Sequence, residues 1–275
     1  MSARLALLVP LTLGLALATG CSEEKSSDGA AEGEGEGEGE GEGEGEGEGE
    51  GEGEGSDDND GDGLTNEEED SLGTDPDNAD TDGDGLDDDV EVDAGSDPTN
   101  PFSWPGDGVW PDLSADAPSA EGYEIGQSPP NMTAVDQFGQ EVSLHQFNHH
   151  AILVDFSAGW CGPCRSVAEE AEELWHTRRD DGFVIVHAMI DDWSGTGSAD
   201  LTFRQEWASE FGLTFPVLGE GQVNAALSGL RRSGLYEGGI PFMILLDTDM
   251  RIHAAYTGSG VESQVMTEVD GILGL

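Results

Sequence analysis

The second half of the chain alternates between short apolar runs and amphipathic stretches. Strand-like runs occupy residues 132–135, 151–157, 183–190, 215–218, 242–246 and 252–256. Apolar positions at helical spacing occupy residues 161–179, 201–211, 224–232 and 261–273. The runs at 151–157 and 183–190 are apolar on both faces, as is typical of central strands covered by helices. The pattern predicts a three-layer α/β domain over residues 123–275.

The first third of the chain has a different composition. The protein has 60 acidic and 9 basic side chains and a formal net charge of −51. Residues 23–101 hold 34 of the acids and a single Lys. So much negative charge argues against a nucleic-acid partner and favours cations as small partners. We therefore expect an acidic N-terminal region attached to one foldable domain.

The N-terminus has the shape of an export signal. Arg4 is followed by an apolar run over residues 5–17, which is too short for a membrane-spanning helix. Small residues then end directly on Cys21, which resembles the bacterial lipobox. The resemblance implies a signal peptide over residues 1–20, a lipid on Cys21 and delivery to the outer membrane. An ordinary secretory signal, with Cys21 incidental, is the alternative.

Residues 32–55 are uninterrupted Glu-Gly repeats. Glycine maximises backbone freedom, the glutamates repel each other, and no apolar side chain is available for burial. We expect residues 21–56 to be a disordered, self-extending tether that holds the payload off the membrane. An acidic interaction tail or a weak cation sponge is the alternative.

Two acidic loops in register follow, 22 residues apart. In each loop, oxygen ligands stand at positions 1, 3, 5, 9 and 12, a glycine stands at position 6, and a backbone carbonyl is available at position 7. This spacing can wrap six or more oxygens around one calcium ion, so calcium in a structural role is the predicted cofactor. The expected ligands are Asp58, Asp60, Asp62, Leu64, Asn66 and Glu69 in the first loop, and Asp80, Asp82, Asp84, Leu86, Asp88 and Glu91 in the second.

Each loop is followed by Gly-Thr/Ser-Asp-Pro, at residues 73–76 and 95–98. The block over residues 57–101 resembles calcium-binding thrombospondin type 3 repeats. It differs from an EF-hand because Leu64 and Leu86 fall at position 7 and the apolar residue at position 8 is missing. Helices flanking the loops are therefore not expected. Residues 102–122, rich in Pro and Gly, are predicted to be a linker.

A pair of thiols lies where the run 151–157 meets the long helical stretch. Residues 160–165 read Trp-Cys-Gly-Pro-Cys-Arg. At a helix start, unpaired N–H groups lower the pKa of Cys161 and make it the nucleophile. Cys164, one turn inside, can attack the resulting mixed disulfide and release the product. Half a zinc site and a merely structural disulfide are the alternatives, but zinc takes four ligands and no nearby His or further Cys follows.

The motif Trp160-Cys161-Gly162-Pro163-Cys164 after Val154-Asp155-Phe156 resembles thioredoxin, and Gly239-Ile240-Pro241 resembles its cis-proline loop. The resemblance covers residues 123–275 and implies the thioredoxin fold. Within this family, the chain resembles the TlpA-like extracytoplasmic branch. The resemblance implies that Asp155 takes the proton of Cys164 and that Pro241 places the Ile240 backbone against the substrate. It also implies substrate contacts at Trp160, Gly162 and Pro163. The family's partner lysine has no counterpart here, because residues 189–192 stand at its expected place. None of the six histidines receives a functional role. We expect His187 to be a packed side chain.

The predicted function is a membrane-tethered, extracytoplasmic thiol–disulfide oxidoreductase, facing the periplasm or the cell surface. Its partners are protein thiols and disulfides, the membrane through its lipid, and an unidentified membrane electron donor. The Gly-Pro pair between the cysteines resembles the reducing members of the family. A thiol peroxidase is one alternative, although Val154 and Ala158 replace the Pro and Thr or Ser of that group. A calcium-dependent surface-binding lipoprotein with a vestigial redox domain is another.

Overall fold

The computed structural model describes residues 57–275. The predicted signal peptide (1–20), the lipidation of Cys21 and the Glu-Gly linker (21–56) lie outside these residues. Within residues 57–275, every helix is too short or too polar to cross a bilayer.

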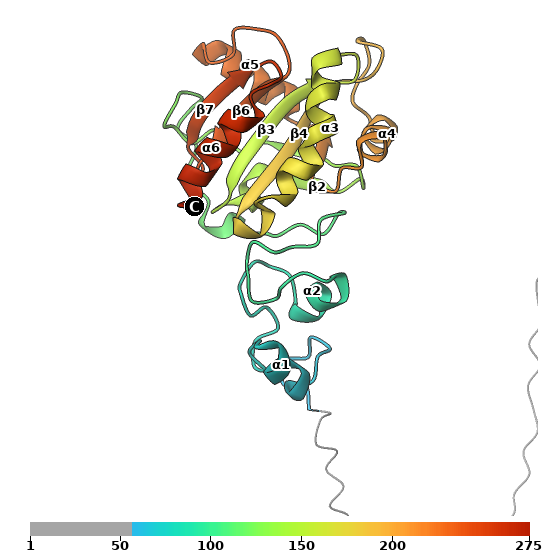
Figure 1. The fold of residues 1–275 in the computed structure, drawn as a ribbon, viewed down its shortest axis with the longest axis vertical. Coiled ribbons are helices and arrows are strands. Elements are labelled where there is room, and N and C mark those ends of the chain that lie inside the picture. Colours follow the sequence, from blue (N-terminus) through green and yellow to red (C-terminus); the bar gives the residue numbers. More distant parts are fainter. Residues whose placement is uncertain (1–56) are drawn as a thin grey trace, which may run out of the picture. The chain divides into compact units, whose positions relative to one another are not determined.

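A seven-stranded mixed sheet forms the centre of the C-terminal domain, in the order β2-β1-β5-β4-β3-β6-β7 (Figure 1). β3 pairs in parallel with β4, and β4 with β5, whereas the other neighbours are antiparallel. The strands are β1 (Thr133–Val135), β2 (Glu141–Ser143), β3 (Ala151–Ala158), β4 (Phe183–Asp191), β5 (Val217–Gly219), β6 (Phe242–Leu246) and β7 (Ile252–Thr257).

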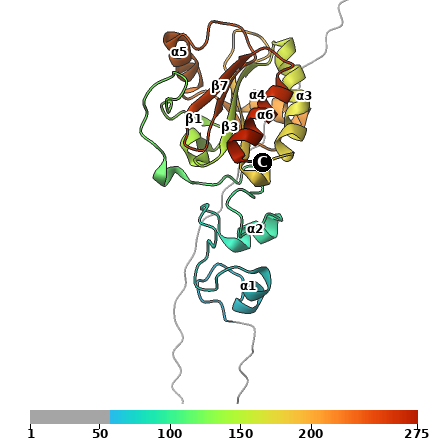
Figure 2. The same cartoon turned by 60° about the vertical axis from the view of Figure 1, so that its left-hand side comes forward.

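The two doubly apolar runs form the middle of this sheet. All eight residues of β3 and the first seven of β4 are buried. Helices α3 (Gly162–His176) and α6 (Glu262–Leu273) cover one face, and α5 (Val223–Ser233) covers the other (Figures 1 and 2). α4 (Leu201–Phe211) packs against α3 and β5. The predicted three-layer α/β architecture is confirmed.

The long helix is shorter than its sequence pattern predicts. α3 ends at His176, because Arg178 leaves helical geometry at φ −144°. A short 3₁₀ turn, η3 (Arg179–Asp181), follows and ends at Gly182, whose φ of +98° requires glycine. A second 3₁₀ turn, η2 (Leu144–Phe147), connects β2 to β3.

Residues 102–122, expected to be a linker, contain one short 3₁₀ turn, η1 (Ser114–Asp116). Trp104 from this segment is nevertheless buried in the domain core. Its ring packs against Trp175 and Phe147, and its Nε1 donates a hydrogen bond to Nε2 of His150 at 3.3 Å. The start of this segment is therefore part of the packed domain, because the core includes Trp104.

Each acidic loop leads into a two-turn helix, α1 (Asn66–Leu72) and α2 (Asp88–Ala94). The expectation that helices would be missing is wrong for the side that follows each loop. Thr65 and Glu68 form a reciprocal capping box at the start of α1. Gly73 and Gly95 end the two helices in the left-handed conformation that glycine adopts without strain.

Candidate functional site

The two thiols of the C-terminal domain lie at the start of α3, directly after β3. Cys161 is the N-cap residue of the helix, and its Sγ accepts a hydrogen bond from the backbone N–H of Cys164 at 3.2 Å. Pro163 lies in the first turn, where the missing N–H costs nothing. Backbone N–H groups at a helix start favour negative charge, so this position stabilises a Cys161 thiolate.

Cys161 and Cys164 are joined by a disulfide in this structure. Cys161 is 4% exposed and lines a surface groove, whereas Cys164 is fully buried and does not line it. The neighbouring Trp160 is 53% exposed.

The loop before β6 brings its backbone to the disulfide. The Ile240–Pro241 peptide bond is cis, and the carbonyl oxygen of Ile240 lies 3.5 Å from Sγ of Cys161. Together, the helix start and this loop form a groove above the sulfur. The groove is lined by Trp160, Cys161, Gly162, Pro163, Ile190, Tyr236, Gly239 and Ile240.

Asp155 lies inside the sheet, on β3, six residues before Cys161. It is fully buried, and its Oδ2 accepts a hydrogen bond from Ser157 Oγ at 2.7 Å. Its Oδ1 has no hydrogen-bond partner. Burial raises the pKa of Asp155 to about 7, although the Ser157 hydrogen bond acts in the opposite direction. A carboxyl group with this pKa can both accept and release a proton near neutral pH.

His187 occupies the position opposite Asp155 on β4. It is fully buried, and its Nε2 lies 3.5 Å from Asp155 Oδ2. His187 is packed, as expected, and it also faces Asp155 across the two strands. Asp155 and His187 are each the fifth residue of their strand, and the parallel register of β3 and β4 brings the two together.

The start of α3 is also bordered by two tryptophans, of which Trp160 was expected from the sequence and Trp193 was not. Trp160 Nε1 donates a hydrogen bond to Asp191 Oδ2 at 3.2 Å. The guanidinium of Arg165 lies 5.2 Å from the centre of the Trp193 ring, and Trp193 Nε1 donates to Glu206. Two partly exposed indoles thus border the dithiol, each held by an acidic side chain.

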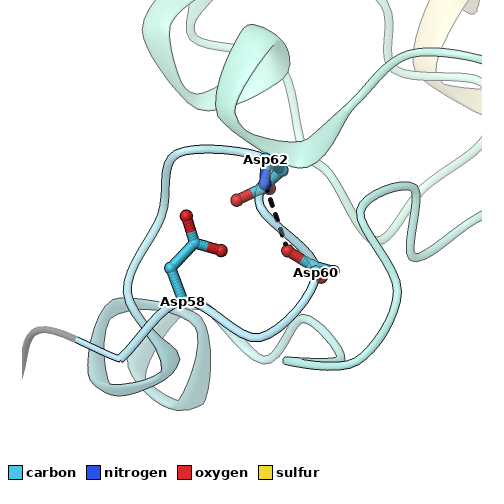
Figure 3. Close-up of side chains that lie close together, drawn as sticks. All are labelled: Asp58, Asp60 and Asp62. Atoms are coloured by element: carbon cyan, nitrogen blue, oxygen red, sulfur yellow. Dashed lines mark hydrogen bonds between the residues drawn. The ribbon is translucent and has the colours of Figure 1, made fainter.

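The acidic block brings three carboxylates together in each loop. Oxygens of Asp58, Asp60 and Asp62 lie within 4.8 Å of one another, and the same holds for Asp80, Asp82 and Asp84. Figure 3 shows the three side chains of the first loop directed toward one space, with the N–H of Asp62 bonded to Asp60. Leu64 and Leu86 each donate their N–H to the carboxylate at position 5.

The two glutamates at position 12 are fully buried. Both carboxylate oxygens of Glu69 and Oε2 of Glu91 have no hydrogen-bond partner, and the same is true of Oδ2 in Asp60, Asp62, Asp82 and Asp84. Burial raises the pKa of Glu91 to about 8 and that of Asp84 to about 7. Burying a carboxylate oxygen without a hydrogen-bond donor is costly unless a bound cation compensates its charge. This set of oxygens therefore fits calcium.

The residues at position 9 do not join these clusters. Asn66 Oδ1 accepts the backbone N–H of Asn59, and Asp88 accepts the backbone N–H and the hydroxyl of Thr81. In both loops, position 9 is therefore hydrogen-bonded to position 2, and these two side chains close the loop.

Residues 124–271 match the Redoxin family. Residues 58–79 and 80–101 each match the Bacterial TSP3 repeat. The two repeat matches have the same 22-residue period as the acidic loops.

Several known proteins are similar to part of this chain. Thiol-disulfide oxidoreductase ResA of Geobacillus kaustophilus is 22% identical over 54% of this chain and 78% of the relative. Thioredoxin H-type of Ricinus communis is 31% identical over 38% of this chain and 80% of the relative. A solved structure of a DsbE-type thiol:disulfide interchange protein from Chlorobium tepidum has 20% identity and a TM-score of 0.46, covering 55% of this chain and 99% of that one.

Proposed function

Because the chain belongs to the Redoxin family and pairs its two thiols at the start of α3, it is a thiol–disulfide oxidoreductase, and we propose that it reduces protein disulfides outside the cytoplasm from a lipid anchor at Cys21. The observation that carries this proposal is the asymmetric dithiol, in which the N-cap residue Cys161 lines the groove and Cys164 is buried behind it. The Gly-Pro pair between them supports the reducing direction.

In the reduced protein, the Cys161 thiolate attacks one sulfur of a substrate disulfide. A bond forms between Cys161 and that sulfur, and the second substrate sulfur leaves as a thiolate that takes up a proton. Cys164 then loses its proton and attacks Sγ of Cys161, which releases the first substrate sulfur. Two electrons pass to the substrate, and the protein returns to the disulfide form of this structure.

Three groups around the sulfurs support these steps. Asp155 accepts the proton of Cys164, because its carboxyl group has a pKa near neutrality. The Ile240 backbone next to Pro241 holds the substrate chain against Cys161. At the start of α3, the groove is lined by Trp160, Gly162 and Pro163.

The N-terminal regions place this domain relative to the membrane. A lipid on Cys21 anchors the protein, and the Glu-Gly stretch acts as a spacer. The clustered aspartates, with Glu69 and Glu91, would hold calcium in the two loops, and the ion would supply charge balance and rigidity to the repeats. A membrane electron donor restores the dithiol after each turnover.

Substitution of each cysteine separates the two roles. Cys161→Ala abolishes the reduction of insulin disulfides, whereas Cys164→Ala accumulates a mixed disulfide between Cys161 and the substrate, which non-reducing gels detect. Retained turnover in Cys161→Ala contradicts the assignment of the nucleophile. Thiol trapping in cells tests the direction: a predominantly reduced Cys161–Cys164 pair supports a reductase, and a predominantly oxidised pair contradicts it.

A further inference from the structure

A buried chain of three side chains leads from α4 to the centre of the sheet. Trp207 is fully buried, and its Nε1 lies 3.3 Å from Nδ1 of His187. Nε2 of the same imidazole is buried without a hydrogen-bond partner and lies 3.5 Å from Asp155 Oδ2. His187 therefore connects Trp207 to the carboxyl group that serves the buried cysteine.

The contact with Trp207 determines which ring nitrogen of His187 carries a proton. An indole N–H can only donate a hydrogen bond, so Nδ1 of His187 must accept it. Burial lowers the pKa of His187 to about 3, so the ring is neutral and has one proton. That proton is on Nε2, and Nε2 faces Asp155.

We propose that His187, fixed by Trp207 as a hydrogen-bond donor through Nε2, is the positioning residue that stabilises the ionised form of Asp155 and so sets the pH range in which Cys164 is deprotonated. A donor that faces a carboxylate favours its charged form. The donor strengthens as Asp155 ionises, because hydrogen bonds to charged groups are stronger than those between neutral groups. This role rests on the proposed thiol–disulfide exchange and goes beyond it, because it concerns the pH range in which Cys164 reacts.

The other groups around Asp155 do not replace this donor. On its own strand, Ser157 donates to the same Oδ2. Glu170 of α3 and Glu262, the first residue of α6, line a cavity of about 10 Å³ next to Asp155 and His187, and β6 contributes Met243. These glutamates can only disfavour the Asp155 carboxylate, and methionine has no proton to donate. Among the residues that line this cavity, His187 supplies the nitrogen donor.

The tautomer can be measured directly on the full chain. In ¹⁵N–¹H spectra of His187 between pH 6 and 8, we expect a protonated Nε2 and an unprotonated Nδ1. In Trp207→Phe, which keeps an aromatic ring but lacks the N–H, signals of both tautomers should appear. A wild-type His187 protonated at Nδ1 overturns the proposal, as does a Trp207→Phe variant that keeps the Nε2–H tautomer alone.

The functional consequence is a shift of the pH profile. The mixed disulfide of Cys161 with 5-thio-2-nitrobenzoate is formed at pH 4, and release of the coloured thiol by Cys164 is followed after a jump to each pH. In His187→Leu, the acid limb of the release rate should move up by about one pH unit, a tenfold loss at a pH on that limb. At pH 9, the rate should equal that of the wild type.

His187→Gln is the matched control, because its side-chain amide keeps an N–H donor in place of Nε2. It should restore the wild-type profile to within a few tenths of a pH unit. An unchanged profile in His187→Leu, or an equal shift in Gln and Leu, overturns the proposal. If His187→Leu does not fold, the wild-type tautomer and the Trp207→Phe spectra still decide it. These spectra do not depend on activity, so their failure is distinct from a failure of the cysteine assignments.

Discussion

The ring of Trp104 lies 5.4 Å from the ring of Trp175, the last buried residue of α3. The two indoles join the segment before the domain to the helix that begins with the dithiol. Trp104 also bonds to the buried His150, whose pKa is lowered to about 4 by burial. The domain core therefore includes a residue that lies 20 positions before the Redoxin match, which begins at residue 124.

Removal of the Trp104 side chain should destabilise the domain. Trp104→Ala leaves a cavity between Trp175 and Phe147, and we expect a loss of about 3–5 kcal/mol in the free energy of unfolding. Trp104→Phe retains an aromatic ring and loses the hydrogen bond to His150, so its cost should be smaller. Urea denaturation of the full chain measures both. A loss below about 1 kcal/mol in Trp104→Ala means that this segment does not stabilise the domain.

Asp155→Asn should change both stability and rate. In the folded state, the pKa of Asp155 is about 7, above its usual value of 3.8. The stability that the protonated carboxyl provides is complete below pH 3.8 and is lost as the pH rises through 7. Since Asn does not ionise, the variant should be more stable than the wild type at pH 8.5, by about 4 kcal/mol from the difference in pKa, and similar to it at pH 4.

Urea denaturation at the two pH values measures this difference for Asp155→Asn. The same variant should release substrate from the Cys161 mixed disulfide more slowly at neutral pH, because the proton acceptor for Cys164 is lost. Equal pH dependence of stability in the variant and the wild type would show that Asp155 ionises as an ordinary surface carboxyl.

Calcium should protect residues 57–101 from proteolysis, because the clustered carboxylates repel each other without a cation. Asp82→Ala with Asp84→Ala should remove the protection around the second loop, whereas Asp93→Ala, on the exposed side of α2, should leave it unchanged. Limited proteolysis with calcium and with a chelator measures this. Disulfide reduction should be the same in both conditions, because the groove is lined only by residues between 160 and 240.

Calcium affinity should rise with pH between 6 and 8. Asp84 and Glu91, with pKa values of about 7 and 8, must lose their protons before they can bind the ion. Calorimetric titration at pH 6 and pH 8 should therefore show tighter binding and fewer released protons at the higher pH. An affinity independent of pH would exclude these two residues as ligands.

Cys21→Ser should release the protein from membrane fractions, because the proposed anchor is the lipid on this thiol. Fractionation of cells that express the wild type or the variant measures the effect. Continued membrane association of Cys21→Ser would demonstrate a second anchor, while purified domain activity should be equal in the two proteins.

The sequence was sufficient to predict the parts of the fold that depend on local patterns. β3 and β4 are recognisable because consecutive apolar residues mark strands that are buried on both faces. Cys161 and Cys164 are recognisable because helix geometry places residues three apart on adjacent turns. The acidic loops are recognisable because their ligands alternate along one short segment.

Relationships between distant segments could not be predicted in this way. The contact between Asp155 and His187 depends on the register of two strands whose starts lie 32 residues apart. The burial of Trp104 depends on where a segment with almost no regular structure meets α3. The hydrogen bond from Trp207 depends on how α4 packs beside the sheet. Tertiary packing determines all three, and no local spacing encodes it.

The shielded position of Cys161 restricts which disulfides can react. With only 4% of this residue exposed, a partner's sulfur must reach it through a groove bordered by Trp160 and Ile240. A disulfide inside a rigid, well-packed protein cannot protrude far enough to align its two sulfurs with the attacking one. Chains that are incompletely folded, or that carry a cystine on a pliable loop, meet this requirement. Substrate selection would therefore depend on how far a substrate's disulfide can protrude from its own fold, and only weakly on the sequence around that disulfide.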